Sequence, residues 1–363
     1  MLSETEGEFL TLHEIVKAAH QKLDRNIWDY LVGGTETETT LGRNRLALDS
    51  LAFRPRVLVD VSKIDTSGEF FGRRTRLPVA LAPIGSLESF EAGGGATAVR
   101  AAAAFGVPAF ISSVTMPGLE ESAAAAVGTK VFQLYVRGDQ NWVDDHVRRA
   151  IAAGYDAFCL TVDTAIYSRR ERDIAKRFVK PWRQRATGMD WQASLNWRDV
   201  ERFKRQHDIT LILKGIATAE DAARACELGV DGVYVSNHGG RQLDHGRGAM
   251  EVLPEVVDAV AGRARIIIDG SFCRGSDIVK AIALGAHTVA IGRLFCCGLA
   301  AAGADGVRRV LELLETEVFG CLGLLGADRF AALDRSYLHP APPVRLPHAL
   351  SAFPLLRLPE EGY

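Results

Sequence analysis

Residues 210–236 read TLILKGIATAEDAARACELGVDGVYVS, and their pattern is that of a strand, a helix and a second strand. The two apolar runs, 210–213 and 231–236, have the length and residue types of buried parallel strands. Between them, 218–228 has a helical pattern, with Thr218 suited to cap its N-terminus and Asp221 in an acidic first turn. This stretch therefore predicts one strand–helix–strand unit of an α/β protein.

The same alternation continues on both sides of this unit. Further strands are predicted at 79–82, 109–112, 131–135, 157–162, 265–268 and 287–291, and helical patterns include 92–105, 141–153, 249–261 and 275–284. Eight such strands with helices between them predict a single (β/α)8 barrel, or TIM barrel. A doubly wound open sheet is the alternative, but no G-x-G-x-x-G opening supports it.

The predicted barrel, 76–336, has a segment on either side. Residues 1–75 begin with a helical stretch, LHEIVKAAHQKL, and predict an N-terminal helical segment that packs on the barrel. Residues 337–363 are a Pro- and Leu-rich tail, expected to cross a surface or a neighbouring subunit. The one long connection, 164–196, follows the fourth strand, and long loops in compact domains tend to be functional or mobile.

Composition excludes several classes of protein. With 47% hydrophobic and 24% charged residues and a formal net charge of −2, the chain fits a globular protein without the basic character of a nucleic-acid binder. The N-terminus, MLSETEGEFL, has no apolar core of a signal peptide, and no long uncharged apolar stretch predicts a membrane span. Six cysteines without a C-x-x-C pair argue against a zinc site or disulfides, and a reducing, cytoplasmic location is expected.

Polar and small residues gather at one end of the predicted strands, whereas the strand bodies are apolar. In a TIM barrel the active site lies at the C-terminal ends of the strands. Polar residues with purely structural roles would be scattered over both ends, so this one-sidedness predicts a catalytic barrel. The residues at those ends are Pro83, Ile84, Gly85, Ser112, Ser113, Gln133, Tyr135, Thr161, Asp163, Lys214, Ser236, Asn237, His238, Asp269, Gly270, Gly292 and Arg293.

The densest group of polar residues is SNHGGRQLD, 236–244. A lone histidine is more often structural, but His238 lies on a glycine-flanked loop at the expected catalytic end and can act as a general base. Asp163, at another strand end, is the candidate to hold its second ring nitrogen. Arg241 and Arg170 can clamp a carboxylate, although a solvated barrel rim also explains two arginines.

The turns after the last two strands predict a phosphate site. DGSFCRGSD, 269–277, and IGR, 291–293, offer backbone N–H groups at helix N-termini, with Arg274 and Arg293 nearby. Lys214, pointing inward at the end of the fifth strand, is costly to bury unless it faces an anion or an electron-rich ring. A flavin with a terminal phosphate satisfies both features.

From about residue 12 to 334 the chain resembles the FMN-dependent 2-hydroxy acid oxidase and dehydrogenase family, which includes glycolate oxidase, lactate oxidase, lactate monooxygenase, mandelate dehydrogenase and hydroxymandelate oxidase. SNHGGRQLD is the most specific motif. The supporting motifs occur in the family's order: DYLVGG, TLGRNR, LAPIG, FQLYV, LTVDT, RRERD, LKGI, DGSFCRGSD and IGR.

The resemblance implies a role for each matching residue. His238 would take the substrate proton, oriented by Asp163; Tyr135 would bind the substrate hydroxyl, and Lys214 would stabilise reduced FMN. The substrate carboxylate would meet Tyr30, Arg170 and Arg241. The residues implied to contact FMN are Pro83, Ile84, Gly85, Ser112, Gln133, Thr161 and Ser236 around the ring, and Asp269, Gly270, Ser271, Arg274, Gly292 and Arg293 towards the phosphate. A homo-oligomer, by resemblance a tetramer, is also implied, and dioxygen or another acceptor would reoxidise the flavin.

The chain departs from the family pattern in several places. Ser271 replaces a glycine and Cys273 replaces the phosphate-binding arginine, which predicts weaker FMN binding unless Arg274 compensates. Val114 stands where glycolate oxidase has a bulky aromatic, Gly85 where many oxidases have alanine, and the segment 178–197 is shorter than the usual lid. These changes predict a wider pocket for mandelate-like or medium-chain substrates, unless Tyr167 refills the space.

Three competing functions remain. A lactate monooxygenase-like enzyme would decarboxylate its product oxidatively. A type 2 isopentenyl diphosphate isomerase-like flavin barrel needs no carboxylate clamp, so the paired Arg170 and Arg241 argue against it. A barrel used only for binding would not need the complete set of His, Asp, Arg, Tyr and Lys side chains.

Overall fold

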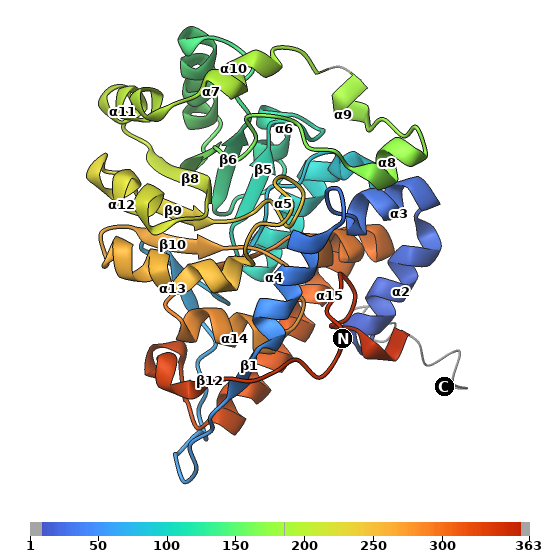
Figure 1. The fold of residues 1–363 in the computed structure, drawn as a ribbon, viewed down its shortest axis with the longest axis vertical. Helices are drawn as coiled ribbons and strands as arrows, with labels where there is room; N and C mark the ends of the chain where they lie inside the picture. Colours follow the sequence, from blue (N-terminus) through green and yellow to red (C-terminus); the bar gives the residue numbers. More distant parts are fainter. Residues whose placement is uncertain (1–8, 185, 357–363) are drawn as a thin grey trace.

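The computed structural model describes residues 9–184 and 186–356. Eight parallel strands form a closed barrel in the order β10-β11-β4-β5-β6-β7-β8-β9, as the TIM-barrel prediction required (Figure 1). The predicted strand ends agree within one residue, except that β8 continues further, to Ile216. The strands are β4 Val79–Leu81, β5 Ala109–Ser112, β6 Lys130–Leu134, β7 Ala157–Thr161, β8 Thr210–Ile216, β9 Gly232–Val235, β10 Arg265–Ile268 and β11 Thr288–Ile291.

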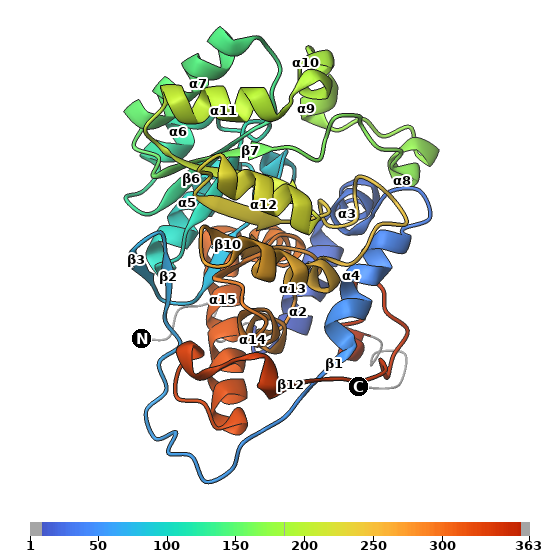
Figure 2. The ribbon, with the colours of Figure 1, turned by 60° about the vertical axis from the view of Figure 1, so that its left-hand side comes forward.

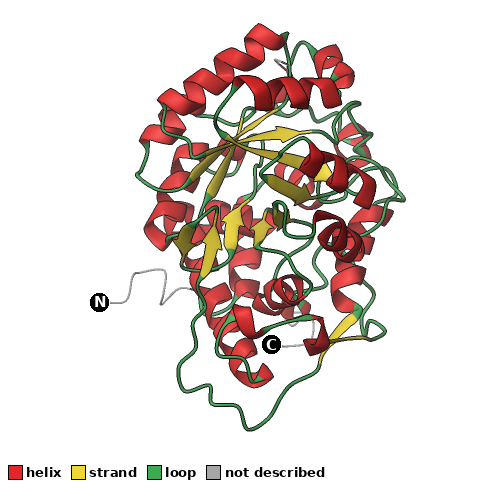
Figure 3. Ribbon diagram, turned by 90° about the vertical axis from the view of Figure 1, so that its left-hand side faces the viewer, coloured by secondary structure: helices red, strands yellow, loops and turns green. Residues whose placement is uncertain are grey.

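Helices surround the barrel on all sides (Figure 3). The helix predicted from the opening stretch is capped as expected, because the Thr218 side chain accepts a hydrogen bond from the Asp221 amide. None of the described helices has the length and apolarity needed to cross a membrane. The surrounding helices are α5 Gly94–Phe105, α6 Leu119–Ala124, α7 Gln140–Ala152, α11 Trp197–Gln206, α12 Ala219–Glu227, α13 Ala249–Val260, α14 Gly275–Ala283 and α15 Arg293–Leu325, with the short 3-10 turn η1 Leu87–Ser89 before α5.

The connection after the fourth strand is largely helical. It contains α8 Glu171–Ala175, α9 Pro181–Gln184 and α10 Met189–Ser194. In Figure 1 the connection runs from α8, beside α3 on the right, through α9 at the upper right to α10 at the top. The connection therefore reaches from the barrel's active end to the N-terminal helices.

The N-terminal segment is only partly helical. Three helices, α2 Leu12–Lys22, α3 Arg25–Val32 and α4 Thr39–Asp49, are followed by β1 Leu51–Phe53 and the antiparallel hairpin β2 Gly68–Phe70 and β3 Arg73–Thr75. The expected helical character does not extend over residues 51–75. Figure 2 shows the chain between β1 and β2 as a long loop below the barrel.

The tail returns to this N-terminal segment. After η2 Phe330–Ala332 and η3 Arg335–Tyr337, strand β12 Leu338–Pro340 pairs antiparallel with β1. Residues 1–8 and 357–363, which include most of the N-terminus examined for a signal peptide, lie outside the described residues.

The inside of the barrel changes from apolar to polar along the strands. Alternate strand residues point inward, and the lower ones form one apolar cluster: Ala80, Ala82, Phe110, Val131, Ala157, Cys159, Ile212, Tyr234, Ile267 and Ala290. Phe70 of the β2–β3 hairpin joins this cluster and closes the bottom of the barrel. The next inward positions, towards the C-terminal ends, are polar on most strands. The apolar cluster thus forms the support on which a polar site rests.

The closure by Phe70 makes a prediction about stability. Phe70→Ala removes a ring that is 3% exposed and packs edge-to-face on Phe110, so we expect a loss of about 3–5 kcal/mol of unfolding free energy. Urea unfolding followed by tryptophan fluorescence measures the loss. Phe319→Ala, at a ring that is 51% exposed, is the control and should change stability by less than about 0.5 kcal/mol. Equal effects of the two changes would show that the hairpin does not support the barrel.

Candidate active site

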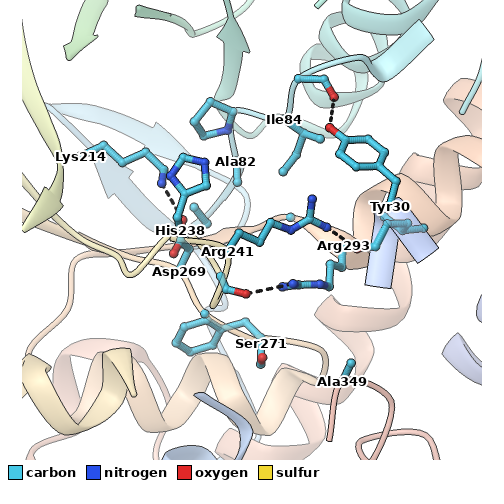
Figure 4. Close-up of a pocket in the computed structure, with 18 of the residues that line it drawn as sticks. Tyr30, Ala82, Ile84, Lys214, His238, Arg241, Asp269, Ser271, Arg293 and Ala349 are labelled. Atoms are coloured by element: carbon cyan, nitrogen blue, oxygen red, sulfur yellow. Dashed lines mark hydrogen bonds and ion pairs between the residues drawn. The ribbon is translucent and has the colours of Figure 1, made fainter. Parts of the chain in front are cut away.

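A cavity opens at the C-terminal ends of the strands (Figure 4). Its empty space, including the open mouth, is about 990 Å³. The structure brings most of the predicted site residues to its wall: Tyr30, Pro83, Ile84, Gly85, Tyr135, Arg170, Lys214, His238, Arg241, Asp269, Gly270, Ser271, Gly292 and Arg293. Val114, whose position was expected to wall the pocket, lines it as well. Residues outside the predicted set also line it, namely Leu31, Ala82, Phe90, Trp182, Gly239, Phe272, Cys273, Ala290 and Ala349.

A hydrogen-bonded layer of inward side chains lies at the ends of three neighbouring strands. Ser112 Oγ donates to Gln133 Oε1 at 2.7 Å, and Gln133 Nε2 donates to Thr161 Oγ1 at 2.9 Å. All three side chains are buried. Because each polar group already has a partner, this layer is rigid. These three residues, expected to contact FMN, form a fixed polar layer beside the cavity.

Lys214 occupies the corresponding inward position on β8, and its partners Ser236 and Asp269 directly follow the next two strands, β9 and β10. Its ammonium donates to Ser236 Oγ at 2.9 Å and lies 3.4 Å from Asp269 Oδ2, while Ser236 Oγ donates to Asp269 Oδ1 at 2.7 Å. Burial lowers the pKa of Lys214, but the charges of Asp269 and Asp163 outweigh burial and raise it overall. The ammonium therefore stays charged at neutral pH. It is placed to stabilise negative charge in the cavity.

The backbone of the His238 loop is unusual. His238, Gly239 and Gly240 all have positive φ, at 59°, 65° and 74°. Gly240 allows helix α4 to approach, since a Cβ there would lie 2.6 Å from Leu41 Cα. A non-glycine residue in the left-handed region costs energy and is found most often where function requires it. The loop is held by the His238 amide, which donates to Ser236 Oγ at 3.0 Å.

The predicted pair of His238 and Asp163 is formed. His238 Nδ1 lies 3.0 Å from Asp163 Oδ1, and His238 Nε2 lies 3.2 Å from the Tyr135 hydroxyl. With its Nδ1–H donated to the carboxylate, the neutral ring presents the lone pair of Nε2 to the cavity. Burial and the charge of Lys214 lower the pKa of His238 below its ordinary value, although Asp163 opposes them. The ring is thus a neutral base at pH 7.

Arg170, Arg241 and Tyr30 also line the cavity, and Figure 4 shows Tyr30 across the cavity from Lys214. Arg241 donates to the Leu31 carbonyl, whereas Arg170 Nε is buried without a hydrogen-bond partner among the described residues. The Tyr30 hydroxyl donates to the Gly85 carbonyl at 2.8 Å. Burial raises the pKa of Tyr30 to about 12, so it remains a neutral donor. This group offers a concentration of donors and positive charge to an anion.

Arg293 and Ser271 form the other end of the cavity. Arg293 Nη2 donates to the carbonyls of Gly33 and Gly239, both at 2.9 Å. Its Nε, like the hydroxyl of Ser271, is buried without a hydrogen-bond partner in residues 9–184 and 186–356. Burial and the charge of Arg241 lower the pKa of Arg293 to about 9, so the guanidinium is still cationic at neutral pH. Unpartnered buried donors beside the N-terminus of α15 suit a phosphate.

Arg274 does not take part in this end of the cavity. Its Nε donates to Glu317 Oε2 at 3.2 Å and its Nη1 to the Ala352 carbonyl at 3.3 Å. The expectation that Arg274 compensates for Cys273 therefore has no support in the geometry, because the ion pair with Glu317 holds the side chain elsewhere. The N-terminus of α14 is also occupied, since the amides of Cys273 and Arg274 both donate to Asp277 Oδ2.

Comparison with known proteins matches this site to a family. The model of the FMN-dependent dehydrogenase family matches residues 19–340. The chain belongs to this family. It is 39% identical to glycolate oxidase 1 of Oryza sativa over 92% of this chain and 96% of that protein, and 39% identical to 4-hydroxymandelate oxidase of Amycolatopsis orientalis over 90% and 97%. A mandelate oxidase structure with bound (S)-2-phenylpropionate is 40% identical, with a TM-score of 0.86 over 93% of this chain and all of that one.

As a member of this family the protein uses FMN. The residues present fit that cofactor, because Lys214 is a buried cation in the cavity wall that would suit the electron-rich ring, and Arg293 Nε and the Ser271 hydroxyl have donors left that would suit the phosphate. The buried thiol of Cys273 supplies no cation there, and burial raises its pKa to about 12. Compared with the family pattern, the phosphate would thus meet one guanidinium instead of two.

Several wall residues carry no chemical signal in the sequence. Ala349 comes from the C-terminal tail and closes the lower side of the cavity in Figure 4. Trp182 comes from the short connection after the fourth strand, and its ring packs edge-to-face on Tyr167 at 6.0 Å. A single tryptophan in the charged run KPWRQR was a weak signal that sequence reasoning missed.

The different surroundings of the two arginines predict different effects on FMN binding. Arg293→Met should weaken FMN binding about 10- to 100-fold, because it removes a charge-assisted donor from the phosphate end. Arg274→Met should change it less than about threefold, since that side chain is paired with Glu317. Fluorescence titration of cofactor-free protein with FMN measures both dissociation constants. A larger effect of Arg274→Met would return the phosphate role to Arg274.

Proposed function

We propose that this protein oxidises (S)-2-hydroxy acids to 2-keto acids, with a preference for aryl or larger alkyl side chains. The observation that carries the proposal is that a neutral His238, held by the Asp163 carboxylate, lines the same cavity as Lys214 and the pair of Arg170 and Arg241. One side of the cavity can remove a proton and stabilise negative charge, and the other can hold a carboxylate. A 2-hydroxy acid fits both tasks, because the carbon that bears its hydroxyl group is bonded directly to its carboxylate carbon.

Each group then has a defined task. The substrate carboxylate is held by Arg170 and Arg241, with the hydroxyl of Tyr30 as a neutral donor. The substrate hydroxyl lies at Tyr135 and His238 Nε2, which takes up a proton while Asp163 stabilises the resulting imidazolium. FMN, when bound, supplies the acceptor for the two electrons that the substrate loses.

The pocket wall near Gly85 supports the preference for larger side chains. A Cβ on residue 85 would lie 2.8 Å from Val114 Cγ2 and 3.8 Å from Trp182 Cδ1, so Val114 uses the space that Gly85 leaves open. Trp182, backed by Tyr167, narrows the mouth that the short lid was expected to open. With Phe90, Val114 and Trp182 the wall is apolar and largely aromatic. An aryl substrate buries more apolar surface against it than glycolate, at about 25 cal/mol per Å².

Oxidative decarboxylation, as in a lactate monooxygenase, is the second candidate, favoured by the glycine at position 85. Analysis of the products for carbon dioxide separates it from simple oxidation to the keto acid.

Dioxygen is the proposed acceptor for the electrons. All six cysteines are free, which supports a reducing, cytoplasmic location, while the proposed homo-oligomer rests on the family resemblance.

The substrate class can be tested by anaerobic absorbance scans of the flavin-loaded protein. We expect (S)-2-hydroxy acids to bleach the flavin band, with mandelate and 2-hydroxyoctanoate giving higher kcat/KM than lactate and glycolate. The physical reason is the apolar wall of Phe90, Val114 and Trp182. A clear preference for glycolate would refute the size preference. Absence of bleaching with every member of the panel would refute the proposed reaction.

The role of His238 can be tested separately. His238→Ala should keep FMN but lower kcat by about 10²- to 10⁴-fold, as removal of a general base does. His245→Ala is the matched control, because His245 lies in the same loop with nearly the same φ, 57°, but its side chain is exposed. Its kcat should be close to that of the wild type. Near-normal flavin reduction in His238→Ala would assign the base elsewhere.

The same residue predicts a pH profile. The neutral form of His238 is the base, and its pKa in the free protein is lowered below 6.5. Activity in kcat/KM should therefore rise with pH through that lowered pKa and be level at neutral pH. Steady-state kinetics with a substrate whose carboxylate is ionised throughout the range measures the profile. A rise centred well above 6.5 would contradict a base held neutral by burial and Lys214.

A further inference from the structure

Lys180 is a buried lysine that the proposed reaction does not use. It precedes α9 in the connection after the fourth strand, and its side chain is 2% exposed. Its ammonium lies 4.0 Å from the centroid of the Tyr30 ring and 3.2 Å from Asp173 Oδ2. No hydrogen bond of good geometry to the ammonium is present within the described part of the chain. A lysine with three donors is rarely buried in this condition.

The surroundings of Lys180 connect it to the carboxylate group of the cavity. Helix α3 contributes Tyr30, whose ring also has the Arg241 guanidinium 5.2 Å from its centroid. The α8 region contributes Arg170 and Asp173, and the connection contributes Tyr167, 6.0 Å from the Lys180 ammonium, with the Arg183 guanidinium on the same ring. Lys180 and Arg241 thus lie over the Tyr30 ring, Arg170 lies over the neighbouring Tyr167 ring at 5.2 Å, and Asp173 is the carboxylate that opposes these cations.

The charges in this group determine when Lys180 carries its proton. Burial, followed by the charges of Arg170 and Arg241, lowers the pKa of Lys180 well below its ordinary value, while Asp173 raises it. A substrate carboxylate at Arg170 and Arg241 adds a negative charge to the same group. Its field acts in the direction of Asp173 and favours protonated Lys180. Binding of the anion and protonation of the lysine therefore assist each other.

We propose that Lys180 is a positioning residue of the carboxylate site, which holds the ring of Tyr30 and takes up a proton from solvent when an anionic substrate binds. The inference rests on the proposed function, because it needs a carboxylate at Arg170 and Arg241. Without substrate, Lys180 is deprotonated and adds no third positive charge to those of Arg170 and Arg241. When a substrate carboxylate binds, all three groups are cationic.

The sign of the pH dependence follows from this coupling. Lys180 loses its proton at a lower pH in the free protein than in the complex. Between those two values binding takes up close to one proton, so the dissociation constant of a carboxylate rises up to about tenfold per pH unit. Below the window Lys180 is protonated in both states and this dependence disappears.

Isothermal titration calorimetry of the FMN-loaded protein tests the proposal. The probe is benzoylformate, the 2-keto acid that oxidation of mandelate would give, titrated from about pH 6 to about pH 10 in buffers of different ionisation enthalpy. All proteins carry His238→Ala, which removes proton uptake by the catalytic base. We expect this protein to take up close to one proton within the window. Lys180→Met in the same background should take up almost none and show a nearly level dissociation constant.

Lys176→Met is the matched control. Lys176 lies four residues earlier, is partly exposed and pairs with Asp29, so this variant should keep the proton uptake. Equal uptake in the Lys180→Met and Lys176→Met proteins would overturn the proposal. If Lys180→Met does not fold, the His238→Ala protein decides, because absence of pH-dependent uptake there also overturns it. Failure to bind benzoylformate at any pH contradicts the proposed function instead, whereas binding without the Lys180-dependent proton contradicts only this inference.

Discussion

The buried ammonium of Lys214 is the charge around which the active end of the barrel is arranged. It lies 3.4 Å from Asp269 Oδ2 and hydrogen-bonds to Ser236, and its field acts on Asp163 on the neighbouring strand. Burial alone would raise the pKa of Asp163, but its contact with His238, which includes a hydrogen bond, and the charge of Lys214 lower that pKa overall, so the carboxylate stays ionised. Asp163 in turn fixes the tautomer of His238. Burial, the mutual contact of Asp163 and His238, and the charge of Lys214 together favour an ionised Asp163 beside a neutral His238.

Among the arginines that line the cavity, positive charge is not balanced by neighbouring carboxylates. Arg241 and Arg293 bring positive charge into a buried space, where the carbonyls of Leu31, Gly33 and Gly239 are their partners in place of carboxylates, and Arg170 Nε has no hydrogen-bond partner among the described residues. Carbonyl groups satisfy donors but leave the charge uncompensated. A substrate carboxylate at one end and a phosphate at the other supply the missing anions. Burial, together with the charges of Arg170 and Arg241, also lowers the pKa of Lys180, whose ammonium lies over the Tyr30 ring.

Much of this could be predicted because it depends on short-range pattern. Strand residues alternate between inside and outside, so the end of each apolar run identifies the residue that faces the cavity, as for Lys214, Ser236 and Asp269. What escaped prediction depends on packing between distant segments. Whether Cys273 or Arg274 faces the phosphate end is decided by the way Asp277 and Glu317 cap and anchor the start of α14. Ala349 and Trp182 reach the wall because a tail and a short connection happen to pack there, which no local period reveals.

The departures at the phosphate end have a consequence for the whole protein. Ser271 holds a positive φ of 61° where the family has glycine, and its hydroxyl and Arg293 Nε are buried without partners among the described residues. Backbone strain is the first free-energy cost to the folded, cofactor-free protein, and unpaired buried donors are the second. FMN can relieve the second cost by accepting those hydrogen bonds, and a ligand that binds only the folded state stabilises it by mass action. With Cys273 in place of the family's second arginine we expect a lower affinity for FMN, and the unpartnered donors of Arg293 and Ser271 are the groups that would couple folding to cofactor binding.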